Sequence, residues 1–276
     1  MLRAKKERKP PELRVPDPNP NIDNWLVLGL DPSVSRTGFA VMGAFVESGV
    51  LQTRWLGIGS VKPDKIEDGR HTRTTLWVRS KLIALYIREY LKLFPANKRT
   101  GLLISTEFPT PENDFLVGLS RILHVILFED GVLADSFGDI RILTPNASTL
   151  RSLMGLKRRG ATNKRENILK AYTFVDQKIY PQLDSDSCDG VLMAMVGSYA
   201  AKILMGKPDE VPNSFLTRLC NATEEIKGKG RNQRIQIVGL LHRPEYWYSY
   251  KKASYSLGVK DASNPKKTLI RKYFFI

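Results

Sequence analysis

The sequence predicts an α/β fold, a mixed five-stranded sheet flanked by helices, with an extension at each end of the chain. Three apolar segments of strand length follow one another near the start and are separated by Gly and Ser residues. Segments of helical length then alternate with two further strand segments. The consecutive strands indicate a meander, and the alternation after them is typical of helices packed on a sheet.

The expected strands are short runs of apolar and β-forming residues bounded by turn residues. They span residues 25–31, 37–45, 50–60, 101–107 and 139–145. Helices are expected where apolar residues recur at helical spacing or fill a longer run. They span residues 73–94, 112–134, 146–155, the later part of 156–174, and 184–206.

Composition divides the chain into three parts. Residues 1–23 are charged and Pro-rich without hydrophobic periodicity, which predicts a disordered basic arm. Residues 24–206 hold the predicted strands and helices and form the expected folded domain. Residues 207–276 interleave basic with aromatic residues. This extension can contact phosphates and stack on unpaired bases, or its aromatic residues can pack on the core or on a protein partner, which is their more usual role.

The charge balance indicates the kind of partner. The chain of 276 residues carries 43 Lys and Arg against 28 Asp and Glu, a formal net charge of +15. A surface this basic attracts polyanions, of which nucleic acid is the commonest. The alternatives are a protein that binds a ribosome or a membrane surface, or a merely solvated basic face. We expect no membrane span and no secretory signal, because no apolar run is long enough. The two cysteines and three histidines lack metal-ligand spacing, so no zinc site is expected.

Four acidic residues lie where strands end or a helix begins. Asp31 ends the first predicted strand, and Glu107 ends the fourth. Asp186 and Asp189 are three residues apart in the first turn of the last predicted helix, which places them on one helix face. Asp184 precedes them and is the candidate helix cap.

Each acid alone has a structural explanation, such as an Asp-Pro turn at Asp31 or a favourable helix dipole for Asp186. The combination is more specific. If the first and fourth strands are neighbours, Asp31 and Glu107 leave the sheet at the same edge, and the helix start can close over them. Crowded carboxylates repel one another unless cations neutralise them. Mg²⁺ suits such oxygen ligands, and a pair of ions can clamp the attacking and leaving oxygens of a phosphoryl displacement.

The segments GLDPSVSRTGFAV, ISTEF and DSDSCDGVLMAM resemble, in order and spacing, the acidic motifs of the RuvC family of Holliday junction resolvases. The resemblance covers roughly residues 25–205. It implies an RNase H-like fold, a homodimer and symmetric nicking of four-way DNA junctions, with two Mg²⁺ ions per active site and Mn²⁺ as a substitute. By position, Asp31, Glu107, Asp186 and Asp189 would be the catalytic and metal-binding acids.

The basic segment RRGATNKREN resembles the stretch of this family that carries a lysine near the scissile phosphate, and Lys164 is the matching residue. A lysine there would offset the charge that builds up on the reacting phosphate. The equally weighted alternative is a solvated loop that contacts phosphates nonspecifically. Four basic residues are candidate DNA contacts, namely Arg158, Arg159, Lys164 and Arg165.

One departure from the family concerns the junction centre. The family commonly has an aromatic residue three positions after the glutamate, where this chain has Thr110 between two prolines. Phe108 or Phe115 are the nearby aromatic residues that could substitute for it. The expected substrate is therefore branched DNA in general, with four-way junctions foremost.

The sequence predicts a structure-selective, Mg²⁺-dependent endodeoxyribonuclease that cleaves Holliday junctions or other branched DNA in recombination, replication or repair. The alternative from another class is a catalytically silent RNase H-like protein that binds nucleic acid within a larger complex. An actin-like ATPase is disfavoured, since we find no second Gly-rich phosphate loop. The expected location is the cytoplasm or nucleoid, with a viral or organellar origin also compatible, and other proteins could bind through residues 207–276.

Overall fold

The computed structural model describes most of the predicted domain and short strands on its C-terminal side. The described residues are 18–32, 36–62, 72–106, 135–145, 147–156 and 163–220, and five short strands between residues 224 and 269. The helix expected over residues 112–134 lies outside them. Within the described residues, the prediction of a mixed five-stranded sheet flanked by helices is confirmed, and a two-residue strand adds a sixth member at one edge.

The central sheet has the strand order β3-β2-β1-β4-β5-β8. Its strands are β1 (Asn24–Asp31), β2 (Thr37–Glu47), β3 (Val50–Val61), β4 (Thr100–Thr106), β5 (Asp139–Leu143) and β8 (Leu241–His242). Two separate hairpins pair β6 (Glu224–Lys227) with β7 (Arg234–Ile237) and β9 (Val259–Asp261) with β10 (Asn264–Leu269). The helices are α1 (Thr72–Leu91), α4 (Ala147–Leu153), α5 (Asn163–Ala171), α6 (Ser185–Leu204), the 3-10 turn η1 (Pro208–Glu210) and α7 (Asn213–Cys220).

Strand β1 joins the two halves of the sheet. It pairs antiparallel with β2, which pairs antiparallel with β3, and this is the predicted meander. On its other side β1 pairs parallel with β4, in a register that sets Leu30 opposite Thr106. The expectation that the first and fourth strands are neighbours is therefore confirmed. Parallel neighbours end at the same edge of a sheet, so β1 and β4 end side by side, at Asp31 and Thr106.

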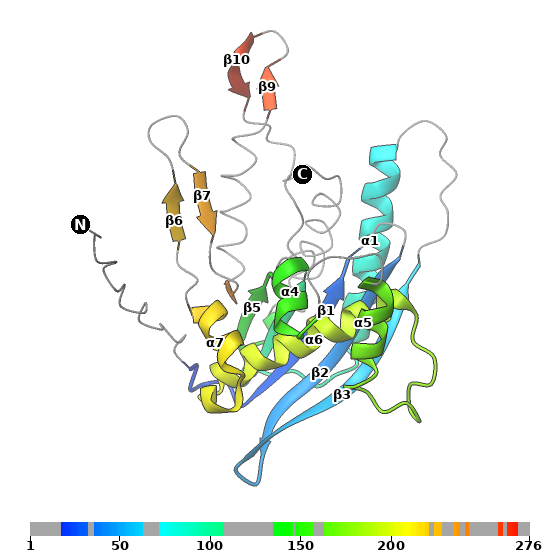
Figure 1. Ribbon diagram of the computed structural model, residues 1–276, viewed down its shortest axis with the longest axis vertical. Coiled ribbons are helices and arrows are strands. Elements are labelled where there is room, and N and C mark those ends of the chain that lie inside the picture. Colours follow the sequence, from blue (N-terminus) through cyan, green and yellow to red (C-terminus); the bar gives the residue numbers. More distant parts are fainter. Residues whose placement is uncertain are drawn as a thin grey trace, which may run out of the picture.

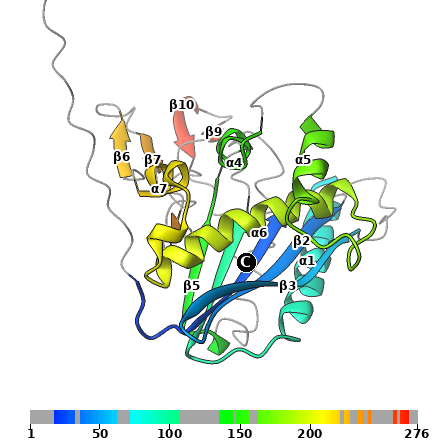
Figure 2. The same cartoon turned by 60° about the horizontal axis from the view of Figure 1, so that its bottom comes forward.

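Helices α6 and α1 cover opposite faces of the sheet (Figures 1 and 2). Alternate residues of β1 face the two helices, as the pleat requires. Trp25 and Val27 belong to the core beneath α6, whereas Leu26, Leu28 and Leu30 belong to the core beneath α1. The near-continuous apolar sequence of β1 is explained by this burial on both faces.

Glycines allow the backbone of α6 to lie directly on β1 and β2. A Cβ atom at Gly29 would collide with the backbone of Ala194 and with the carbonyl oxygen of Gly190. Gly190 in turn faces the backbone of Phe39, which leaves no room for a side chain there either. The backbone of α6 thus packs directly against the backbones of β1 and β2. The close fit at these glycines fixes the position of the helix along the strands.

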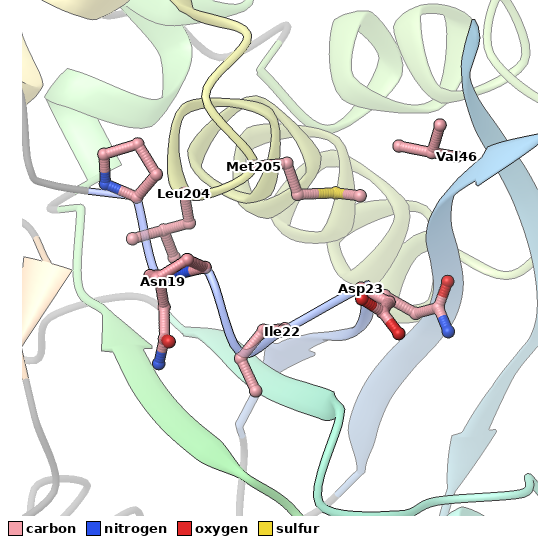
Figure 3. Close-up of a pocket in the computed structure, with 9 residues that line it drawn as sticks. Asn19, Ile22, Asp23, Val46, Leu204 and Met205 are labelled. Atoms are coloured by element: carbon pink, nitrogen blue, oxygen red, sulfur yellow. The ribbon is translucent and has the colours of Figure 1, made fainter. Parts of the chain in front are cut away.

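The packed core extends slightly beyond residues 24–206 at both ends. Ile22 is buried in the core beneath α6, and the Asn19 N–H donates to the carbonyl of Leu204 at 3.3 Å. Val211 and Phe215, which come after α6, are buried in the same core. Figure 3 shows a pocket at this end of α6, with Asn19 and Leu204 among its lining residues. The helix has 20 residues, so this pocket lies about 30 Å from the helix start, where the predicted site residues are.

Candidate functional site

Asp184 caps the N-terminus of α6, as the sequence predicts. Its backbone is extended, with φ −73° and ψ 168°, and its carboxylate accepts a hydrogen bond from the Ser187 N–H at 2.7 Å. This bond satisfies one of the amide groups that a helix leaves unpaired in its first turn. The cap fixes the residue at which the helix begins, and with it the place of Asp186 in the first turn.

Two residues from the sheet side also hold Asp184. Ser60 on β3 donates its hydroxyl to Asp184 Oδ2 at 2.6 Å, and Arg36, just before β2, donates to the same oxygen at 3.2 Å. The Arg36 guanidinium lies 3.8 Å from a carboxylate oxygen of Asp186 as well. Burial alone raises the pKa of Asp184, but hydrogen bonds from Ser60 and Ser187 and the charge of Arg36 lower it, and the net shift is downward. An ionised carboxylate therefore ties the start of α6 to the strands.

Asp31 lies at the end of β1, on the sheet face that carries α6. Trp25, Val27 and Gly29 all face this helix, and the alternation along the strand gives Asp31 the same face. Its partner on β2 is Gly38. A Cβ atom at Gly38 would collide with the backbone carbonyl of Asp186. The start of α6 therefore rests on the residue paired with Asp31, and the Cα atoms of such a pair are about 5 Å apart.

Asp189 lies one turn further along α6 and faces α5. It is half-buried, and its Oδ1 accepts a hydrogen bond from Asn167 Nδ2 at 2.6 Å. Burial raises the pKa of Asp189 and the charge of Asp186 adds to the rise, whereas the hydrogen bond from Asn167 and the charges of Lys164 and Arg151 lower it. The net shift is upward. The charge of Asp186 thus reaches Asp189, as their spacing of three residues predicts.

Lys164 is near enough to Asp189 for its charge to lower the pKa of that carboxyl group. It stands exposed in the first turn of α5, which packs against α6. Arg165 is the next residue and is also exposed. The structure therefore places a solvent-accessible cation beside the predicted acids. The other two predicted DNA contacts, Arg158 and Arg159, lie outside the described residues.

Glu107 also lies outside the described residues, directly after the end of β4. Its catalytic and metal-binding roles remain predictions. The structure does show where β4 ends. Its last residue, Thr106, is paired with Leu30, the residue before Asp31. On the α6 side of β4, Ser105 lies against Gly197 of the helix.

The described acids have the chemistry of a site for a hard divalent cation. Carboxylate oxygens of Asp31, Asp186 and Asp189 are the ligand type that Mg²⁺ prefers. The pKa of Asp189 is raised by burial and by the charge of Asp186, so a cation here would relieve both effects. Among the described residues, no three His, Cys, Asp or Glu side chains already converge as a set that could hold one metal ion. The donor set fits Mg²⁺ in kind, and Glu107 is the predicted acid that this set lacks.

The sequence did not reveal Arg36, Ser60 and Asn167, which donate hydrogen bonds to Asp184 or Asp189, or Arg151, which binds Asn167. Each of these hydrogen bonds joins residues that lie 15 or more positions apart in the sequence. Only Asn167 carried a local signal, since it lies three residues after Lys164 on the same helix and hence on a similar face.

Several solved structures are similar to this chain. The Thermus thermophilus RuvC structure is 18% identical, over 66% of this chain and 97% of that chain, with a TM-score of 0.43. The fowlpox virus resolvase, solved with substrate Holliday junction DNA, is 14% identical, over 65% and 99% of the two chains, with a TM-score of 0.37. The yeast mitochondrial Holliday junction resolvase Ydc2 is 11% identical, over 72% and 85%, with a TM-score of 0.40. The sequence matches no known family model and no curated protein.

The topology is the one expected of an RNase H-like fold. An antiparallel meander, β3-β2-β1, continues through the parallel strands β4 and β5, with α6 across one face. This is the fold that the resemblance to RuvC resolvases implies. An RNase H-like fold does not by itself fix an activity, so function depends on the residues at the edge where β1 ends and α6 begins. Within the described part of the chain, no helix combines the length and apolar character that a membrane span requires.

Proposed function

We propose that this protein is a metal-dependent endonuclease that cleaves branched DNA, with four-way junctions as its foremost substrate. The observation that carries the proposal is the meeting of Asp31 with the start of α6. Gly38, the strand partner of Asp31, lies against the backbone of Asp186. This contact supports the proposal that Asp31 and the acids at the start of α6 act together at one edge of the sheet.

In this proposal Asp31, Glu107, Asp186 and Asp189 hold Mg²⁺, two ions per site, with Mn²⁺ as a substitute. Bound there, the ions would stabilise the charge on the attacking and leaving oxygens of a phosphodiester. Position 107 directly follows Thr106 in the sequence, and Thr106 is paired with Leu30, which directly precedes Asp31. That correspondence supports Glu107 as the acid that completes the set.

Lys164 serves as the cation beside the reacting phosphate. Its charge already acts on Asp189, so a phosphate held at the acids would lie within its electrostatic reach. As a flexible point charge, lysine can follow the phosphate through the displacement. Arg158, Arg159 and Arg165 are proposed to contact phosphates outside the reacting group and so to position the strand.

Junction cleavage by paired nicks requires two sites, so we propose that the protein acts as a homodimer. The surplus of basic residues, 43 Lys and Arg against 28 Asp and Glu, supports a polyanionic substrate. The basic and aromatic residues of 207–276 are proposed to contact the arms of the DNA or a further protein. Roles in recombination, replication or repair, in the cytoplasm or nucleoid, would be consistent with such a substrate.

A panel of DNA structures tests the proposal. The purified protein is incubated with Mg²⁺ and end-labelled linear, flap, three-way and four-way DNAs of equal arm length. We expect paired nicks in the four-way junction, weaker cleavage of the other branched forms and none of the linear duplex. Asp186→Asn should abolish nicking, while Asp209→Asn, an exposed acid beyond the far end of α6, should not. Junction binding with no nicking by the wild-type protein would instead favour the catalytically silent alternative.

A further inference from the structure

Helix α5 contacts the proposed metal ligand Asp189 through a neutral amide. Asn167 on α5 donates an N–H from Nδ2 to Asp189 Oδ1 at 2.6 Å. The bond joins residues 22 positions apart, across the interface of two packed helices. This bond restricts the rotation of the Asp189 carboxylate, because any other rotamer gives up a charge-assisted hydrogen bond.

The orientation of this amide is fixed from its other side. Arg151 on α4 donates from Nη1 to Asn167 Oδ1 at 2.5 Å. A guanidinium can only donate, so the asparagine oxygen must face Arg151, and the amide nitrogen must then face Asp189. The arginine therefore decides which end of the amide the carboxylate meets.

Arg151 is itself held in place and its charge is balanced. Its side chain is only 7% exposed, and its Nη2 donates to Glu166 Oε2 at 2.8 Å. Glu166 precedes Asn167 on α5, so the same helix supplies these two partners of the arginine. The chain of contacts Glu166–Arg151–Asn167–Asp189 links α4, α5 and α6 and ends on the carboxylate.

A neutral donor suits a carboxylate that must also bind a cation. An arginine in direct contact would neutralise the carboxylate and compete with a metal ion, whereas an amide fixes its direction and leaves its charge. The hydrogen bond occupies Oδ1 and leaves Oδ2 for another ligand. Lys164, one turn earlier on α5, remains beside the same carboxyl group from the solvent side.

We propose that Asn167 is a positioning residue for Asp189: oriented by Arg151, it holds the carboxylate in the direction in which it binds a divalent cation. This inference rests on the proposed function, because it assumes that Asp189 is a metal ligand. It assigns a role to a residue that the acidic motifs do not contain. Residues that orient metal ligands in this way typically change metal affinity or activity by about 10–100-fold when they are replaced.

Two substitutions test the proposal together. Asn167→Leu and Asn167→Ala both remove the amide donor but differ in size. Equal effects would show that the loss of the donor is responsible, and unequal effects would show that altered packing contributes. Leu169→Ala is the control, since Leu169 is 60% exposed on the same helix. Thermal unfolding shows which variants remain folded. Mn²⁺ binding to the free protein, followed by electron paramagnetic resonance, is the readout that does not depend on activity.

We expect both Asn167 variants to bind Mn²⁺ about 10-fold or more weakly than wild type and the Leu169 variant to bind normally. On a cleavable junction, kcat at low Mg²⁺ should fall, KM for DNA should stay constant, and high Mg²⁺ should restore part of the rate. Wild-type Mn²⁺ affinity in both folded variants would overturn the inference while leaving the nuclease proposal intact. A wild-type protein that neither binds Mn²⁺ nor cuts any DNA would overturn both.

Discussion

Gly38 lies against the backbone carbonyl of Asp186, and this contact seats the first turn of α6 on the strand that is paired with Asp31. A larger residue at position 38 would lift the helix start from the sheet. Because the proposed site has one acid on each side of this contact, the glycine sets the distance between them. Its role is steric, since only a residue without Cβ lets the two backbones approach this closely.

Replacing Gly38 by alanine should therefore impair both stability and cleavage. We expect the free energy of unfolding to fall by about 1–3 kcal/mol, the usual cost of overpacking a close contact. Gly43→Ala is the matched control on the same strand, because its Cβ would meet Leu56 at 3.5 Å, an ordinary van der Waals distance. Chemical denaturation and junction cleavage measure the two effects. A Gly38 variant indistinguishable from the Gly43 variant would show that the helix start can move without consequence.

Asp184→Ala should destabilise the protein by about 1 kcal/mol, because it removes the N-cap of α6. The substitution also leaves Ser60 and Arg36 without the carboxylate they share, so two side-chain contacts to the helix start are lost. Ser60→Ala removes one of these contacts and should cost less. The two free energies of unfolding are compared by urea titration. Equal stability of the Asp184 variant and wild type would mean that water replaces the cap at no cost.

The local features of the site could be predicted from the sequence, and the long-range contacts could not. The Asp184 cap and the shared helix face of Asp186 and Asp189 can be inferred from residue spacing, which a single sequence displays. The bonds from Arg36 to Asp184 and from Asn167 to Asp189 depend on how distant elements dock. No periodicity encodes them.

The ends of the folded domain were also beyond prediction. Ile22 belongs to a segment whose Pro-rich composition indicates disorder, yet it is buried beneath α6. Phe215 lies beyond the last predicted helix and packs into the same core. In each case a single apolar residue packs into the core of the domain, and a single residue gives no hydrophobic periodicity from which its burial could be predicted. The segment RIQIVGLLH, residues 234–242, indicates one added strand, but it forms two, and only Leu241 and His242 pair with β5, because that pairing depends on an available sheet edge.

Lys164→Ala should slow junction cleavage by about 100-fold or more, the usual loss when one charge-stabilising donor is removed from a site of this kind. Binding should change little, because one phosphate contact among many contributes a small share of affinity. Lys178→Ala is the control, since Lys178 is an exposed lysine in the turn after α5. Single-turnover rates and equilibrium binding separate the two effects. Unchanged cleavage in the Lys164 variant would favour the alternative of a solvated basic loop.

Junction binding should weaken steeply with salt. Each neutralised phosphate contributes a slope of roughly −0.9 in a plot of log affinity against log salt for duplex DNA. Arg158→Ala and Arg159→Ala should each reduce this slope by about 1 if they contact phosphates. Fluorescence anisotropy with a labelled four-way junction across a salt series gives the slopes. A flat titration for the wild-type protein would remove the electrostatic basis of the proposed substrate.

The proposed chemistry depends on carboxylates that hold divalent cations against a DNA strand, and a binding-and-cleavage assay on Asp31→Asn and Asp186→Asn tests this most directly. Single-turnover cleavage of a four-way junction is measured in Mg²⁺, and binding of the same junction is measured in Ca²⁺. We predict that both variants bind as wild type does and that neither cuts above the uncatalysed background. Wild-type cleavage by either variant would contradict the assignment of these acids to a catalytic metal site.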